Sequence, residues 1–184
     1  MKNLSRLLFV TVLLISFSTS NAQDKNNPWA LSLGVNAVDF YPVGEDTPQG
    51  DYFDEYFNAK DHWNILPSIS TLSVSRYLSD GFTFTATGSI NKISKFGSDT
   101  DPITGEETTR ELDDLAYFGI DGGVSYSFMD VIKSKTIDPY LGVGGGYTWI
   151  DNIGAGTLNG TLGLTYWASE NVGINVNSTY KHSF

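Results

Sequence analysis

The chain contains no cysteine among its 184 residues. This absence excludes disulfide bonds, thiolate metal sites, a thiol nucleophile and a cysteine-linked lipid anchor. Basic residues are also scarce, with 11 Lys and Arg against 21 Asp and Glu and a net charge of −10. Nucleic-acid binding needs a basic surface that neutralises phosphates, so the sequence argues against a nucleic-acid partner.

Long apolar runs are missing after residue 22, so the sequence predicts no membrane-spanning helix, which needs about 18 to 20 apolar residues. The first 22 residues have a different character. Lys2 and Arg6 give a positive start, an apolar run extends from Leu7 to Phe17, and the small residues Ser20-Asn21-Ala22 follow. This pattern predicts a signal peptide over residues 1–22 and a mature chain that starts at Gln23.

What the chain does have is strict alternation, most clearly from Pro139 to Tyr166. Leu141 and Val143 share one face with Tyr147, while the opposite face carries glycines and, further along, Thr and Asn. A period of two predicts β-strands, and each half is about ten residues long, which suits a tilted strand that crosses a bilayer. Large aliphatic residues occupy only one face and the other is small and polar. A soluble barrel would place its bulky residues inside, so the pattern favours a membrane β-barrel.

Seven such strands are expected, over residues 29–40, 66–78, 82–90, 115–128, 139–149, 157–166 and 172–180. A bulge is expected near Ser70, a tight turn at Ser79-Asp80-Gly81, and long acidic loops after the first and third strands, including Asn91 to Asp114. Short turns alternating with long loops predict an all-β, up-and-down antiparallel barrel. Because closed bacterial barrels have an even strand number, we expect eight strands when complete. Residues 23–184 would then form the barrel domain, with the last strand and any periplasmic domain missing.

Four stretches resemble the N-terminal barrel of outer-membrane protein A relatives of the Bacteroidota type. They are NPWALSLGVNAVDF from Asn27, VSRYLSDGFTF from Val74, DPYLGVGGGYTW from Asp138 and VGINVNSTYKHSF from Val172. The resemblance implies an eight-stranded barrel in the outer membrane of a Gram-negative bacterium, surrounded by lipid and lipopolysaccharide. It also implies, for the intact protein, a periplasmic domain that binds peptidoglycan. None of that domain's ligand-binding residues can be placed in this chain.

Aromatic residues supply two sets of candidate contacts. Those at strand ends are expected at the membrane interface: Trp29, Phe82, Phe128, Tyr147, Trp149, Tyr166 and Tyr180. Those in the first long loop would either contact an extracellular ligand or fold back on the barrel rim: Tyr52, Phe53, Tyr56, Phe57 and Trp63.

Asp121 is the one charge expected in mid-strand on the inner face. It is either a hydrated carboxylate or half of an ion pair that plugs the lumen, with Arg76 or Lys92 as its candidate partner.

No catalytic, cofactor or metal site is expected. The glycines of Gly142 to Gly146 lack the dinucleotide fingerprint and make room inside a small barrel, and the acidic loops lack calcium-binding spacing.

The two histidines, His62 and His182, are expected to be ordinary rim or loop residues, because the neighbouring Ser183 would point to the opposite side of its strand. The sequence thus predicts a non-enzymatic membrane anchor without a cofactor. A narrow channel and an adhesin that uses the acidic loops remain as alternatives.

Overall fold

The computed structural model describes residues 23, 25–40, 59, 60, 62–100, 102–105 and 107–184, so the predicted signal peptide lies outside the described residues. The described residues form nine strands: β1 Trp29–Gly34, β2 Ala37–Val38, β3 Asn64–Ile65, β4 Thr71–Ser79, β5 Phe82–Thr100, β6 Glu107–Ser127, β7 Ile137–Ile150, β8 Ile153–Ser169 and β9 Val172–Ser183. The described part of the chain contains no helix, and so none that could cross a membrane.

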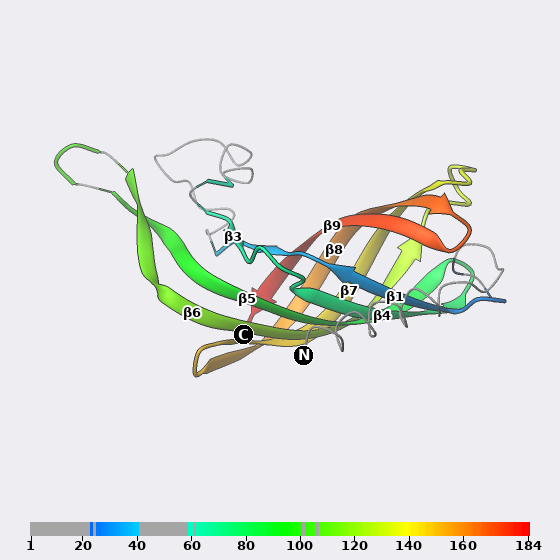
Figure 1. Ribbon diagram of the computed structural model, residues 1–184, viewed down its shortest axis with the longest axis horizontal. Coiled ribbons are helices and arrows are strands. Elements are labelled where there is room, and N and C mark those ends of the chain that lie inside the picture. Colours follow the sequence, from blue (N-terminus) through cyan, green and yellow to red (C-terminus); the bar gives the residue numbers. More distant parts are fainter. Residues whose placement is uncertain (1–22, 24, 41–58, 61, 101, 106) are drawn as a thin grey trace, which may run out of the picture.

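Seven strands form one antiparallel sheet in the order β1-β4-β5-β6-β7-β8-β9, and β2 and β3 pair separately. Each strand of the large sheet is paired with its neighbour in sequence order, which is the up-and-down arrangement. The sheet curls into an open half-barrel (Figure 1). The predicted all-β, up-and-down barrel architecture is confirmed, with seven strands present. Strands β1 and β9 are the two edges and run in the same direction.

Alternating burial gives the half-barrel two chemically distinct faces. Along β4 the hydroxyl residues Ser73 and Ser75 are partly covered, whereas Leu72 and Val74, which alternate with them, are exposed. The same alternation continues on β8, where Leu162 is 61% exposed. Aliphatic side chains therefore cover the convex outside of the sheet and small polar side chains line its concave inside. The predicted orientation of the strand faces is confirmed.

The prediction for the connection after the third strand is wrong. Residues 91–114 were expected as a polar loop, but β5 continues to Thr100 and β6 already begins at Glu107. The two strands stay paired as a long hairpin that extends beyond the other strands (Figure 1). Register shifts between Ile93 and Ser98 mark the place where this extension leaves the regular ladder.

The first two strands are also shorter than expected. The predicted strand 29–40 is interrupted after Gly34, and the second strand begins only at Thr71, so Ser70 precedes the strand and is not a bulge within it. The β4–β5 turn is as predicted, because Asp80 and Gly81 both have positive φ, 47° and 84°. Successive positive φ values match the turn geometry that the twist of a two-residue hairpin requires.

A small cap lies against β5, on the side of the sheet from which the long hairpin extends. It consists of β2 and β3, with the residues that join them to β1 and β4, and both of its strands contact β5 (Figure 1). Beneath it, Ile93 is fully buried and Tyr117 nearly so, and the ring of Phe40 packs edge-on against Tyr117 at 6.4 Å. This cluster contains the only large apolar side chains buried within the described residues. The cap thus forms a small apolar core at one end of a polar interior.

Candidate functional site

The inner face of the half-barrel is crossed by an ion pair. The Lys181 ammonium on β9 lies 2.7 Å from Asp121 Oδ2 and 2.9 Å from Oδ1, and the Asn159 amide donates to Oδ1 at 2.7 Å. The side chains of Lys181 and Asp121 are only 24% and 19% exposed. Asp121 belongs to β6, so the pair spans β7 and β8 and bridges strands that are not neighbours.

The predicted partners of Asp121 are wrong. Lys92 points to the outer side of β5 and forms an exposed ion pair with Asp114 at 2.8 Å. Arg76 also faces outward and lies over the Trp29 ring, 5.2 Å from its centroid. The alternation already excludes both, because they share parity with the exposed Ile90 and Val74. Of the two alternatives for Asp121, the lumen ion pair is the one observed.

Glycines on β7 make the space that this ion pair occupies. A Cβ on Gly146 would collide with Asp121 Oδ1 and would lie 2.6 Å from the carbonyl oxygen of Ile120. A Cβ on Gly144 would collide with the backbone of Gly122. The expected role of the GVGGG stretch, which is to make room inside the barrel, is therefore confirmed at these two positions.

Hydroxyl and amide side chains continue the polar lining on either side of the ion pair. Ser73 pairs with Thr87 at 2.8 Å, and Thr161 pairs with Thr179 at 2.9 Å, each across two neighbouring strands. Towards the β8–β9 turn, the Asn175 amide donates to the Tyr140 hydroxyl at 2.9 Å. These cross-strand bonds satisfy polar groups that face inward.

The cap is fixed by asparagines that sequence reasoning did not single out. The Asn64 amide donates to the carbonyl oxygens of Val38 and Lys95 at 3.0 and 2.9 Å, and its oxygen accepts from the backbone of Ser94 and Lys95. Asn91 donates to the carbonyl oxygen of Asn64 at 2.9 Å. These side chains replace the ladder bonds that the interrupted strands lack, so they hold the cap on β5.

The outer face carries most of the predicted interface aromatics in exposed positions. Trp29, Phe82, Tyr147, Trp149, Tyr166 and Tyr180 are all at least 36% exposed, and only Phe128 is half-buried, against Tyr126. Tyr147 and Trp149 lie with ring centroids 4.5 Å apart near the β7–β8 turn, and Phe82 and Tyr126 are 5.0 Å apart near the opposite end. Aromatic pairs therefore occur towards both ends of the apolar surface. Their placement at a membrane interface stays a prediction.

Of the predicted loop aromatics, Tyr52, Phe53, Tyr56 and Phe57 lie outside the described residues. Trp63 is described and is half-buried beside the cap. It lines a hollow of about 380 Å³ together with Lys92, Lys95 and Asp114. Trp63 thus lies against the barrel, which agrees with the alternative that these aromatics fold back on the rim.

The histidines lie far apart in the fold. His62 is buried beside the cap, whereas His182 belongs to the edge strand β9 and pairs in register with Leu158. His62 was predicted to be an ordinary loop or rim residue, and the structure shows that it is buried. Ser183 follows His182 on an extended strand, where successive side chains point to opposite faces, so these two residues do not form a nucleophile–base pair.

Lys181 is the residue of this inner site that sequence reasoning missed. Its parity places it on the inward face with Asn177 and Thr179, but the predicted last strand ended at Tyr180, whereas β9 continues to Ser183. Extending the alternation by one residue would have found the only inward-facing lysine of β9. A scan of protein-family models found no match to this chain, and neither curated proteins nor solved structures gave a match.

Proposed function

We propose that this chain is an integral outer-membrane β-barrel protein that acts as a structural anchor. The observation that carries the proposal is the inverted polarity of the half-barrel. Leu162 and Val143 on its outside are 61% and 73% exposed, while Ser, Thr, Asn and an ion pair occupy its inside. In water so large an exposed apolar surface is unfavourable, whereas in a bilayer it contacts lipid tails. Strand pairing meanwhile satisfies the backbone polar groups between neighbouring strands, whereas the outer edges of β1 and β9 still need a partner strand.

The two edge strands support a barrel that is complete with one further strand. Because β1 and β9 run in the same direction, one strand of opposite direction would pair antiparallel with both. The result is an eight-stranded barrel, the size whose interior is just filled by side chains. In the intact protein, the resemblance to outer-membrane protein A relatives suggests a following periplasmic domain that tethers the membrane to peptidoglycan.

A flotation experiment tests the anchor proposal. The full chain is refolded with phosphatidylcholine vesicles, which are then floated through a density gradient and washed with carbonate or urea. We expect the protein to remain with the vesicles and to migrate faster on a gel without boiling than after boiling. Recovery of folded protein in the aqueous fraction would contradict the proposal.

A narrow channel is the second candidate function, with the Asp121–Lys181 pair as its proposed gate. The pair bridges β6 and β9 across the polar interior, so it would obstruct a water-filled path along the barrel axis. Single-channel recording of the refolded protein tests this function. A channel would show discrete conductance steps that increase when Asp121→Ala removes the bridge. Silent bilayers, or a conductance unaltered by the substitution, would exclude a gating role for the pair.

A further inference from the structure

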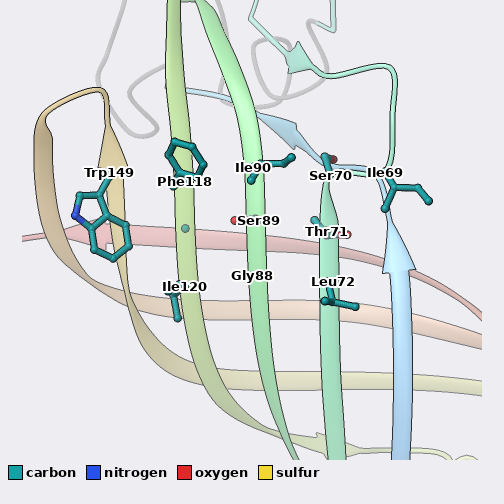
Figure 2. A pocket seen from close by; sticks show the side chains of 11 residues that line it. Ile69, Ser70, Thr71, Leu72, Gly88, Ser89, Ile90, Phe118, Ile120 and Trp149 are labelled. Carbon is teal, nitrogen blue, oxygen red and sulfur yellow. The ribbon is translucent and has the colours of Figure 1, made fainter. Parts of the chain in front are cut away.

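Two hollows lie along β5, and both are also bounded by the segment between β3 and β4. The first, of about 380 Å³, is lined by apolar side chains that include Ile69, Leu72, Ile90 and Ile120 (Figure 2). The second, also about 380 Å³, is lined by Trp63, Lys92 and Lys95.

Glycine creates the first hollow. Gly88 points outward between Leu72 on β4 and Ile120 on β6, and a Cβ built on it would meet nothing within 4 Å (Figure 2). Phe118 and Trp149 flank the hollow at the end nearer the β7–β8 turn (Figure 2). The hollow is thus an open apolar depression within the apolar outer face.

The second hollow lies further along β5 than the first. Ile90 lines the first and Lys92 the second, and the two residues are neighbours on the outward face of β5, about 7 Å apart along the strand. Among the described side chains that line the second hollow, two ammonium groups accompany one carboxylate, that of Asp114, so these three groups together are positive on a chain whose net charge is −10.

Both lysines can contribute charge to a ligand. The Lys92–Asp114 pair is exposed at 60% and 57% of its side chains, and exposed pairs are weak enough for a competing anion to exchange with them. Lys95 donates to the backbone carbonyl oxygens of Lys60 and Trp63, which are neutral acceptors and leave its charge uncompensated by these two bonds. An indole ring beside two ammonium groups is typical of a site at the boundary between hydrocarbon and water.

We infer that the two hollows form one binding site for a membrane lipid with a phosphate-bearing anionic headgroup. An acyl chain occupies the depression over Gly88, and the phosphate binds Lys92 and Lys95 beside Trp63. Charge complementarity selects the headgroup, and continuity with the lipid-facing surface of the barrel supplies the chain. The inference rests on the proposed membrane location, and it adds a defined site to a surface that otherwise contacts lipid without preference.

The test compares phosphatidylglycerol with phosphatidylcholine of identical acyl chains. Each lipid is titrated into the refolded full chain in neutral detergent micelles, and native mass spectrometry counts the lipids retained. We expect phosphatidylglycerol to be favoured by about fivefold per lysine, and the preference to disappear in Lys92→Gln/Lys95→Gln. Lys135→Gln, in the connection between β6 and β7, is the matched charge control and should keep the preference.

A second pair of variants tests the chain-binding depression. Gly88→Leu should lower the retention of both lipids, because the leucine side chain fills the depression. Gly160→Leu is its control, since Gly160 also points outward with nothing within 4 Å of an added Cβ, but lies on β8 away from the depression. Each variant is first checked for the gel-mobility shift of folded protein, and the single variant Lys92→Gln replaces the double one if the latter fails that check.

Three outcomes would overturn the inference or its basis separately. Equal losses in Gly88→Leu and Gly160→Leu would show that lipid binds the whole surface without a site. An undiminished preference for phosphatidylglycerol in the lysine variants would exclude the headgroup hollow. A protein that stays folded in water without detergent would contradict the membrane location itself, whatever the variants do.

Discussion

The ion pair across the interior should contribute measurably to stability, whereas the ion pair on the outside should not. Asp121 accepts from Lys181 at 2.7 and 2.9 Å and from Asn159 at 2.7 Å, and both charged side chains are at least three-quarters covered. Hydrogen bonds to charged groups contribute about 1.5 to 3 kcal/mol, and breaking a fully buried pair costs about 3 to 5 kcal/mol. Because this pair retains some solvent contact, we expect a coupling energy of about 2 kcal/mol.

The chain contains its own control for this measurement. Lys92 and Asp114 lie 2.8 Å apart, close to the 2.7 Å between Lys181 and Asp121, but their side chains are 60% and 57% exposed. Solvent screening and the entropy of the long side chain limit exposed pairs to about 0 to 1 kcal/mol. The two pairs therefore differ in burial while their chemistry is the same.

Double-mutant cycles measure both couplings. Asp121→Ala, Lys181→Met and the double variant form one cycle, and Asp114→Ala with Lys92→Met forms the other. Urea unfolding is followed by tryptophan fluorescence and gel mobility in phosphatidylcholine vesicles. These vesicles carry no net charge, so no anionic lipid binds the hollow lined by Lys92 and Lys95 during the measurement. A coupling for the inner pair no larger than that for the outer pair would refute the reasoning.

Two further substitutions have matched controls. Gly146→Val should destabilise the barrel by about 1 to 3 kcal/mol, because its Cβ collides with Asp121, whereas Gly160→Val, which meets nothing within 4 Å, should cost no stability in the same urea titration. An equal loss in both would contradict the space-making role of Gly146. Asn64→Ala removes bonds to Val38 and Lys95 worth about 1 kcal/mol each, so hydrogen exchange should accelerate at least tenfold in residues 62–66. Asn177→Ala, on the exposed edge strand, should leave that exchange unchanged, and acceleration there as well would point to global loosening.

The strands and the direction of their faces were predictable because the physical signal is local. On β8, Leu158, Leu162 and Leu164 recur every second or fourth residue against Asn159 and Thr161, and the structure places the leucines outside. A period of two leaves no other regular structure that separates these residues onto two faces. Burial then follows parity from Thr157 to Ala168.

The long hairpin could not be predicted in the same way. Its paired positions include Lys95 with Glu111 and Ser98 with Thr109, which have no apolar alternation to signal a strand. Such pairing continues a backbone ladder that is already formed between β5 and β6. The evidence for these strands is the pairing between two segments. Because neither segment alternates by itself, the periodicity of the sequence does not predict them.

The cap and the inner ion pair depend on contacts distant in sequence. Asn91 binds Asn64 across 27 residues, and Lys181 binds Asp121 across 60. Parity along a strand gives the face of each residue, but not which strand lies opposite it. For this reason Asp121 was predicted as an inward charge while its partner was not.

The central claim is that the outer face contacts lipid and the inner face does not. The chain has no cysteine, so single cysteines at Leu162 and Thr161 can carry a spin label without background. After insertion of each variant into vesicles, collision of the label with oxygen is compared with collision with a water-soluble nickel chelate. The account predicts that the label at Leu162 collides more often with oxygen than with the nickel chelate. It also predicts that the ratio of oxygen to nickel collisions is lower for the label at Thr161 than for the label at Leu162. Equal ratios, or a higher nickel accessibility at Leu162, would contradict it.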